Sequence, residues 1–311
     1  MRVGLAVSLV ALALLGSVGW SAFRLSAIST QPATIDLGGG PRNVLILGYG
    51  GGSHPGAYLS DSMVLVSENG SREAELSIPR DLWVQLPPNS GRYAKINEAL
   101  QDGVNNGGLD SGGDLAAQKV QDVTGLQVTG WLLENFEGFR NTIDALGGVD
   151  VNVQRAFSAQ YPVNDDPNVD ARWKVIHFDA GPQHMDGERA LEFARARYAD
   201  NPQEASDFAR SARQQQLIAA IRARVASPAG AIHFLPLVNA AAGAIHTNLP
   251  ATELATFVAG LHPDQTKQVA LDTSNVLVDG RSADGQDILL PRSGNYALIP
   301  AYVKQQLGTV A

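Results

Sequence analysis

Hydrophobic residues recur in two different periods along this chain, and these periods predict both strands and helices. Short runs of branched and aliphatic residues at Asn43–Gly48, Ser62–Ser67 and Ala74–Pro79 predict buried strands, since glycine or polar residues close each run. The last two runs are joined through Asn69-Gly70, a dipeptide that is typical of tight hairpin turns. The first third of the folded region is therefore expected to be rich in sheet.

Helical periods appear further along the chain and alternate with further strands. Helices are predicted at Asp114–Val123, Asn135–Leu146, Gly187–Phe193, Phe208–Val225, after Pro250, and at Tyr296–Leu307. Asn135 and Asp186 are suited to cap the helices that begin there, and Gly147-Gly148 is suited to end one. Further strands are expected at Val149–Val153 and Gln268–Leu271. Without an internal repeat, this alternation predicts one α/β domain with helices on both faces of a sheet.

The N-terminal segment Val3–Trp20 is apolar, carries no charged residue, and has about the length that a helix needs to cross a bilayer. We expect residues 1–24 to form a transmembrane anchor and residues 25–41, which are small, polar and contain Gly and Pro, to form a linker. Residues 42–311 then form the folded domain. A cleaved signal peptide is the alternative, and both interpretations place the folded domain outside the cytoplasm.

Charge and cysteine content exclude several classes of function. The formal net charge of −8 argues against a nucleic-acid-binding protein, which needs a basic surface to neutralise phosphates. The chain has no cysteine, so a thiolate nucleophile, a cysteine-built zinc site and a disulfide framework are all excluded. An anionic ligand would have to be held by a local cluster of Arg and Lys.

Polar residues at the ends of the first predicted strands form one candidate site. The glycine-rich loop at residues 48–60 follows a strand and can cradle phosphate through backbone N–H groups, although a flexible turn is the alternative. Asp61 follows this loop and is a candidate Mg²⁺ ligand, or else a residue that caps the loop. Arg80 and Asp81 follow the third strand, where the Arg80 guanidinium suits phosphate oxygens. Lys95 adds a second cation, unless it simply lies at a solvated helix start.

Arginines further along the chain form a second candidate group. Arg195 and Arg197 are two residues apart, so an extended backbone would project both to one side as a strand-like clamp. Arg210, Arg213 and Gln214 fall at i, i+3 and i+4 of a predicted helix and share the face near its N-terminus, where the helix dipole favours anions. Six carboxylates lie in the same stretch, so surface salt bridging is the alternative.

Taken together and in order, these motifs resemble the LytR-CpsA-Psr family of cell-envelope proteins. The residues that carry the resemblance are LSDSMVLVS, SIPRD, KINEAL, GGVDVNV, FDAGPQHMDGERALEFARARY and DFARSARQQQLI, behind one N-terminal apolar segment. The resemblance implies an α/β/α fold around a mixed central sheet. It also implies a Mg²⁺-dependent phosphotransferase, held in the cell membrane by a single pass with its C-terminal domain extracytoplasmic. Such an enzyme moves a glycopolymer from undecaprenyl pyrophosphate to peptidoglycan and forms a phosphodiester.

The resemblance also implies roles for individual residues. By position, Asp61 resembles the metal ligand, and the pyrophosphate ligands correspond to Arg80, Arg195, Arg197 and Arg210. Lys95 and Gln214 match further polar positions around the head group, with Asp81 and Arg213 as supporting members of the same motifs. Many relatives carry a second acidic residue in the loop before Asp61, whereas residues 48–60 here contain no Asp or Glu.

Two other functions fit the same residues. A polyprenyl-pyrophosphate pyrophosphatase would use water in place of the sugar acceptor. A non-catalytic protein that binds lipid-linked glycans would retain the cations without needing the metal. For the phosphotransferase, Asp61 and Asp81 are the carboxylates to test as a general base.

Overall fold

A mixed six-stranded sheet forms the centre of the fold. The computed structural model describes residues 42–52, 56–69, 72–164, 171–205, 207–227, 244–250, 253–254, 257 and 266–307. The strand order is β11 (Ile245–Thr247), β6 (Gly130–Asn135), β1 (Arg42–Tyr49), β2 (Ser60–Asn69), β3 (Arg72–Ser77) and β12 (Lys267–Ala270). Strand β1 is parallel to β6 and β3 is parallel to β12, whereas the other neighbours are antiparallel. The three predicted early strands are confirmed.

Strands β2 and β3 form the hairpin that the sequence predicts, with its turn one residue later than Asn69-Gly70. Asn69 is the last paired residue of β2 and lies opposite Arg72, so the two-residue connection is 70–71. Strand β1 pairs with β2 from Arg42 to Gly48, and the register then shifts, so that Tyr49 lies opposite Ser60. This bulge leaves Asp61 as the extra residue at the start of β2, a place where ladder pairing is interrupted and side chains are re-aimed.

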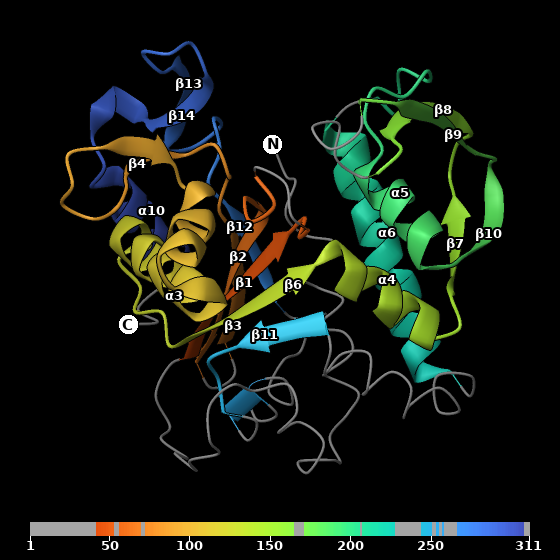
Figure 1. Cartoon of the computed structure of the whole chain (residues 1–311), viewed down its shortest axis with the longest axis horizontal. Helices are drawn as coiled ribbons and strands as arrows, with labels where there is room; N and C mark the ends of the chain where they lie inside the picture. The colour runs from red at the N-terminus through yellow and green to blue at the C-terminus, as the bar shows by residue number, and fades with distance from the viewer. Residues whose placement is uncertain are drawn as a thin grey trace.

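Two helices cover one face of the sheet. Helix α3 (Glu98–Thr124) and helix α10 (Leu298–Leu307) lie together on the left of Figure 1. Their buried side chains join the alternate sheet residues in one core that includes Leu45, Leu65, Val120, Trp131 and Val303. Two small hairpins complete this half of the molecule: β4 (Trp83–Gln85) with β5 (Tyr93–Lys95), and β13 (Leu277–Arg281) with β14 (Asp287–Pro291), which is followed by η1 (Arg292–Gly294).

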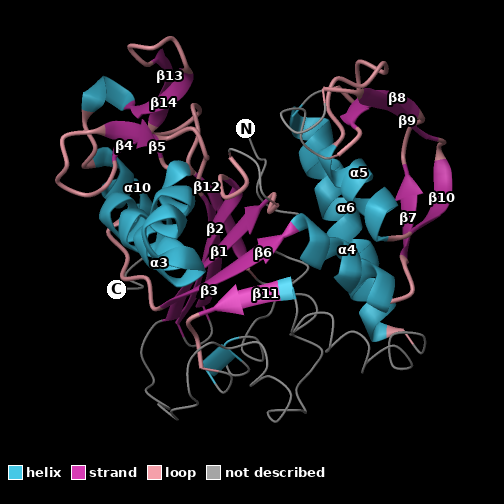
Figure 2. Cartoon of the chain, in the orientation of Figure 1, coloured by secondary structure: helices cyan, strands magenta, loops and turns pink. Residues whose placement is uncertain are grey.

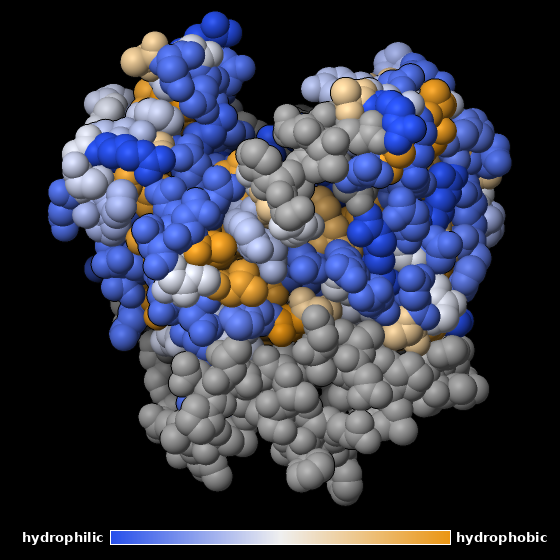
Figure 3. All heavy atoms as spheres, in the orientation of Figure 1, coloured by the Kyte–Doolittle hydropathy of each residue, from blue (hydrophilic) through white to orange (hydrophobic). Residues whose placement is uncertain are grey.

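A second core lies beyond the carboxyl end of β6, and the described residues of the six-stranded sheet do not contribute to it. It contains α4 (Phe136–Ala145), α5 (Gly187–Arg195) and α6 (Asp207–Ala226), with the hairpin of β8 (Phe157–Pro162) and β9 (Trp173–Phe178), and the strands β7 (Val149–Val153) and β10 (Gly181–Met185). The rings of Phe157, Phe178 and Phe193 lie 5.1 to 6.2 Å apart at its centre. Figure 2 shows these helices and hairpins grouped apart from α3 and α10. On the face shown in Figure 3, a notch separates the two halves.

Capping explains where the helices of the second core begin. The Asn135 side chain accepts a hydrogen bond of 2.7 Å from the backbone N–H of Gly138, and the Asp186 side chain accepts one of 2.8 Å from that of Arg189. Both predicted caps are therefore confirmed. Helix α3 is longer than predicted. Its first half was not predicted, because the helix bends at Gly107 and Gly108 and its apolar residues do not keep one helical period across the bend.

The predicted membrane segment and linker, residues 1–41, lie outside the described residues, as does most of the helix expected after Pro250. Among the residues that the structure describes, no helix combines the length and the apolar character needed to cross a membrane. The described part confirms a mixed α/β fold around a mixed central sheet.

A carboxyl group is buried within the sheet at the end of β6. Glu134 is 2% exposed, and within the described residues its Oε2 atom has no hydrogen-bond partner. Burial raises the pKa of Glu134 well above its usual range, because the ionised form would lose its hydration. The folded protein therefore keeps this proton to a higher pH than the unfolded chain does. The stability that this provides is complete below the unfolded pKa and is lost as the pH rises through the folded pKa.

Replacing Glu134 with Gln is expected to remove this pH dependence. The difference in unfolding free energy between variant and parent should shift in favour of the variant between pH 5 and pH 8, by about 1.4 kcal/mol for each unit of pKa elevation. Urea unfolding at several pH values measures it. The same charge change at an exposed position, Asp279→Asn on β13, is the control. A constant difference across that range would contradict a protonated Glu134.

Close contact between α4 and α5 gives a second prediction. A Cβ atom at Gly187 would lie 2.3 Å from the Arg140 carbonyl oxygen, so an alanine forces the two helices apart. Gly187→Ala should lower the free energy of unfolding by about 1–3 kcal/mol. Asn141→Ala, at an exposed position of α4, should change it by less than about 0.5 kcal/mol. Equal stability of the two variants would show that the helices tolerate the added methyl group.

Candidate functional site

Strand direction brings the first candidate residues to one edge of the sheet. Strands β1, β3 and β6 run in the same direction, so their carboxyl ends meet, and β2 begins at this same edge. Asp61 lies at the start of β2, Arg80 follows the end of β3, and Asn135 ends β6. The sequence places these residues far apart, whereas sheet topology places them at a common edge, where ligands commonly bind in α/β folds.

Four charged side chains form one cluster at this edge. Arg80 Nη1 lies 2.6 Å from Asp61 Oδ1, and Arg80 Nε lies 3.6 Å from Asp81 Oδ2. Lys95 Nζ lies 2.8 Å from Asp81 Oδ1. The two cations and two carboxylates alternate, so their formal charges sum to zero, and all four are partly exposed. The fold therefore brings together four residues that the sequence analysis identified in separate motifs: Asp61, Arg80, Asp81 and Lys95.

Backbone hydrogen bonds hold the segments that carry this cluster. The backbone N–H of Asn97 donates to the Arg80 carbonyl at 3.3 Å, and the Asn97 carbonyl accepts from the backbone N–H of Ser60 at 3.1 Å. Lys95 is paired with Trp83 in the β4–β5 hairpin, which sets its side chain beside Asp81. The KINEAL motif thus supplies both a cation and the backbone that joins the two neighbouring motifs.

The glycine-rich loop lies against the start of α4. A Cβ atom at Gly50 would lie 3.5 Å from the ring of Phe136, and one at Gly51 would lie 3.3 Å from the Asn135 Cβ atom. Gly51 also has a positive φ of 77°, which a residue with a side chain rarely adopts. Small residues at these two positions therefore permit the loop to approach the first residues of α4. Residues 53–55 of the loop lie outside the described residues.

Arg195 contacts the same aromatic ring. Its guanidinium carbon is 4.0 Å from the centre of the Phe136 ring, and its Nη1 donates a 2.9 Å hydrogen bond to the Tyr161 hydroxyl. Burial raises the pKa of Tyr161, and the neighbouring Arg195 opposes that rise. Phe136 thus lies next to both Gly50 and Arg195, which connects the loop to the second group of candidates.

The strand-like clamp predicted for Arg195 and Arg197 is wrong for Arg195. This residue is the last of α5, and the backbone becomes extended only at Ala196, with φ −48° and ψ 128°. Arg197 does have a strand-like pairing, as a single antiparallel bridge to Gln160. The reason is that the cap at Asp186 starts a helix whose apolar face, with Leu191 and others, continues to pack through residue 194.

Arg213 and Gln214 are buried behind this segment and bind its backbone. Arg213 is 2% exposed, and it donates to the carbonyls of Phe193, Ala196 and Glu204 and to the Glu204 carboxylate at 2.9 Å. Burial lowers the pKa of Arg213, and the Glu204 carboxylate opposes this. Gln214 Nε2 donates to the Ala194 carbonyl at 3.3 Å. These contacts fasten the chain that carries Arg195 and Arg197, and a direct contact of Arg213 or Gln214 with pyrophosphate stays a prediction.

Arg210 is also buried, with 4% of its surface exposed. It shares its helix face with Arg213 and Gln214, as the i, i+3, i+4 spacing predicts, and all three side chains are buried. The shared face is therefore confirmed, whereas binding of pyrophosphate by Arg210 stays a prediction.

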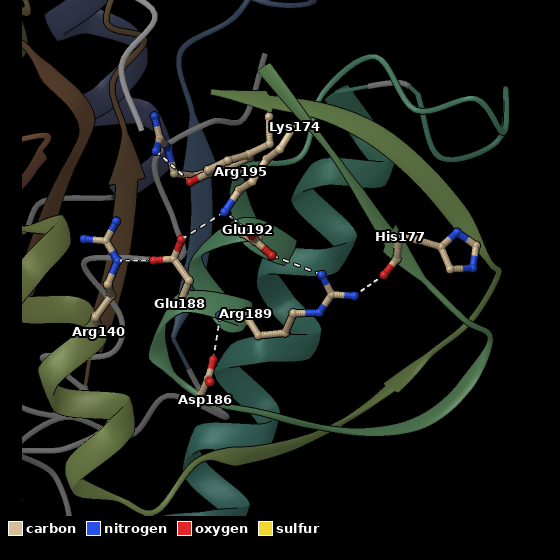
Figure 4. A network of polar contacts seen from close by, with 9 residues as sticks. Arg140, Lys174, His177, Asp186, Glu188, Arg189, Glu192 and Arg195 are labelled. Carbon is tan, nitrogen blue, oxygen red and sulfur yellow. Dashed lines mark hydrogen bonds and ion pairs between the residues drawn. The ribbon is translucent and has the colours of Figure 1, made fainter. Parts of the chain in front are cut away.

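Salt bridges form around α5, as the alternative for this stretch predicted, but their partners from α4 and β9 were not predicted from the sequence. Figure 4 shows Arg140 Nε paired with Glu188 at 2.6 Å, and Lys174 Nζ paired with Glu192 at 2.6 Å and Glu188 at 3.4 Å. Arg189 Nη1 also pairs with Glu192, at 3.0 Å. The Glu192 carboxylate raises the pKa of Lys174. Arg189 and Glu192 are three residues apart on α5, so their pairing follows from spacing along the chain, whereas Arg140 on α4 and Lys174 on β9 are brought to these carboxylates only by the fold.

The carboxylates at the sheet edge are too few to hold a magnesium ion without other ligands. Asp61 is 38% exposed and can be reached by a cation, but among the described residues no three His, Asp or Glu side chains converge as a metal site. Mg²⁺ is commonly held by one or two carboxylates together with water and substrate phosphates. A magnesium ion would fit this site if it arrived with a phosphate ligand, and Asp61 is the exposed carboxylate that could hold it, which stays a prediction.

Comparison with known proteins identifies relatives over most of the chain. Polyisoprenyl-teichoic acid–peptidoglycan teichoic acid transferase TagV of Bacillus subtilis (strain 168) is 29% identical over 244 residues, which cover 78% of this chain and 56% of that protein. The transferase TagU of Oceanobacillus iheyensis, which has the same descriptive name, is 34% identical over 202 residues, or 64% of this chain and 56% of the relative. The matched part of this chain thus spans little more than half the length of these relatives.

A solved structure and a family model both match this chain over most of its length. The crystal structure of B. subtilis TagV matches this chain with a TM-score of 0.60 at 24% identity, and the match covers 87% of this chain and 98% of that chain. The LytR_cpsA_psr family model matches residues 24–298, which include every charged residue discussed above. The chain therefore belongs to the LytR_cpsA_psr family.

Proposed function

We propose that this protein is a phosphotransferase that moves a glycopolymer from a polyprenyl-pyrophosphate carrier to peptidoglycan. The observation that carries the proposal is the cluster of Asp61, Arg80, Asp81 and Lys95 at the sheet edge, with Arg195 connected to it through the loop and Phe136. The names of TagV and TagU support the same reaction class, with a teichoic acid as the polymer that those relatives carry.

Charge balance supports an anionic substrate together with a metal ion. Without a ligand, Arg80 is neutralised by Asp61 and Lys95 by Asp81. A bound pyrophosphate competes with these carboxylates for the cations, and its own charge exceeds what a neutral cluster can balance. Arg195, Arg197 and a divalent cation at Asp61 supply the missing positive charge. Binding of pyrophosphate to Arg80 leaves the Asp61 carboxylate available to that cation.

The proposed reaction needs positioning and charge neutralisation rather than a covalent nucleophile. A peptidoglycan sugar hydroxyl attacks the phosphorus atom next to the glycan, a new P–O bond forms, and the bond to polyprenyl monophosphate breaks in line. Arg80 and Arg195 stabilise the charge on the phosphoryl oxygens and on the leaving group. Asp81, which Lys95 orients, accepts the proton of the attacking hydroxyl. When bound, Mg²⁺ neutralises the phosphoryl oxygens, as divalent ions do in other phosphoryl transfers.

The membrane topology is part of the proposal. Residues 1–24 form a single-pass anchor and residues 25–41 a linker, so the catalytic domain works outside the cytoplasm, next to the membrane that holds its lipid carrier. The apolar residues of Val3–Trp20 support this arrangement.

One assay separates the candidate functions. The full chain in detergent micelles is incubated with a polyprenyl-pyrophosphate saccharide and peptidoglycan fragments, with and without Mg²⁺, and release of polyprenyl phosphate is followed. Metal-dependent release together with a glycan-modified acceptor is the expected result. Release without acceptor modification would favour a pyrophosphatase, and binding without turnover would favour a lipid-glycan binding protein.

Substitution of the cluster residues is expected to separate binding from catalysis. Arg80→Ala should weaken pyrophosphate binding and lower kcat/KM by about 10²-fold or more, which is the usual effect of losing a preorganised donor. Asp61→Asn should lower Mg²⁺-dependent kcat by a similar factor, about 10²-fold, while binding of the lipid persists. Kinetics in saturating and limiting Mg²⁺ measure both effects.

A pair at the opposite edge of the same two strands provides matched controls. Arg42 and Glu68 form an ion pair of 3.3 Å between β1 and β2, far from the carboxyl edge of β1. Arg42→Ala and Glu68→Gln should leave turnover close to that of the parent. If Asp61→Asn retained full metal-dependent turnover, the assignment of Asp61 as the metal ligand would be wrong.

A further inference from the structure

A single exposed tyrosine follows the two arginines in a strained backbone conformation. Tyr198 is 77% exposed, the most exposed of the large hydrophobic residues in the described chain. Its φ is +51°, in the left-handed region that only glycine and a few short polar residues adopt readily. Such a conformation costs on the order of 1–3 kcal/mol and persists only where the surrounding structure enforces it.

The surrounding structure does enforce it. The backbone on the N-terminal side is held by the bridge from Arg197 to Gln160 and by Arg213, which donates to the Ala196 carbonyl at 2.7 Å. On the C-terminal side, the Asp200 N–H donates to the Ser158 carbonyl at 2.8 Å, while the Ser158 N–H donates to the Asp200 carboxylate at 2.7 Å.

Two further contacts complete this attachment. Asn201 Nδ2 donates to the Ala156 carbonyl at 3.1 Å, and Arg213 donates to the Glu204 carbonyl at 3.0 Å. Residues 196–204 are therefore fixed to β8 and α6 on both sides of Tyr198. A chain segment held at so many points is not a loose loop, and it presents one aromatic ring to solvent in a fixed place.

Burial does not account for this ring. Within the described residues, the Tyr198 ring stacks on no other aromatic ring, although five such contacts occur elsewhere in that part of the chain. The strained backbone at Tyr198 is not explained by packing of its side chain, and such strain commonly marks a ligand-binding position. Tyr198 directly follows Arg197, so a ligand whose phosphates are held by Arg195 and Arg197 places its next chemical group near this ring.

We propose that Tyr198 stacks on the sugar ring that is attached directly to the pyrophosphate and so makes the protein distinguish a glycan-loaded carrier from an empty one. One face of a pyranose presents C–H groups, which pack on an aromatic ring, while the phenol hydroxyl can bond the sugar's polar edge. This inference rests on the proposed function, since it assumes that the arginines hold the pyrophosphate. Tyr198 contributes specificity for the loaded carrier, whereas the charged residues contribute binding of the phosphates.

A pair of lipids tests this proposal with the full chain in micelles. The probes are undecaprenyl pyrophosphate and the same lipid carrying one hexosamine, and their dissociation constants are measured side by side. The parent should bind the sugar-bearing lipid more tightly by about 2- to 10-fold, the range expected for one aromatic stacking contact. Tyr198→Leu should abolish this preference and leave affinity for the sugar-free lipid unchanged, whereas Tyr198→Phe should largely retain the preference.

Two further variants guard against effects on folding and on the surface in general. Tyr198→Gly relieves the strained φ, so its thermal midpoint should stay close to that of the parent while the sugar preference is lost. Trp173→Leu removes another exposed aromatic residue of the same half of the molecule, on β9, and should retain the preference.

The outcomes distinguish failure of the role of Tyr198 from failure of the proposed pyrophosphate site. If the parent binds both lipids equally, or if Tyr198→Leu and Tyr198→Gly keep the preference, the role of Tyr198 is wrong while the proposed function stands. Equal loss of preference in Trp173→Leu would likewise overturn a specific role for Tyr198. If Arg195→Ala leaves binding of both lipids intact, or if the parent binds neither, the proposed pyrophosphate site itself fails, and this inference fails with it.

Discussion

The parallel pairing of β1 with β6 is the constraint on which the rest of the molecule depends. Strand β1 lies in the first core, whereas β6 leads directly into α4 and the second core. Their register places Tyr49 opposite Asn135, which brings the glycine-rich loop after β1 against the first residues of α4. A slip of one residue would turn every side chain of β6 to the opposite face. The two groups of cations would then no longer be connected.

The charged groups are held by two different kinds of interaction. At the sheet edge, Asp61, Arg80, Asp81 and Lys95 are partly exposed and neutralise one another, so an anionic ligand can exchange with their carboxylates. Behind α5, Arg213 is buried and binds backbone carbonyls, where removal of its partners would leave an uncompensated charge. Exchangeable pairs suit a binding site, and the buried ones suit the support that keeps the neighbouring chain in place.

Several features of the site follow directly from local sequence. Apolar runs with polar ends predicted β1, β2 and β3, and the caps at Asn135 and Asp186 predicted where α4 and α5 begin, because both signals act within a few residues. The ordered motifs also predicted the family. The helical position of Arg195 was missed, because the helix was predicted to end at Phe193 and in fact continues to Arg195. Two arginines in alternate positions do not by themselves distinguish a strand from the last turn of a helix.

The sequence by itself determined the residue types, the ends of most elements and the set of charges available for an anionic ligand. Only the tertiary structure decided which of those charges meet. Asp61 and Arg80 are joined because antiparallel pairing returns β3 to the edge where β2 begins. Arg195 is linked to the glycine-rich loop because one ring, Phe136, lies next to both. Such contacts depend on strand direction and helix packing between distant segments, and no local pattern of residues records them.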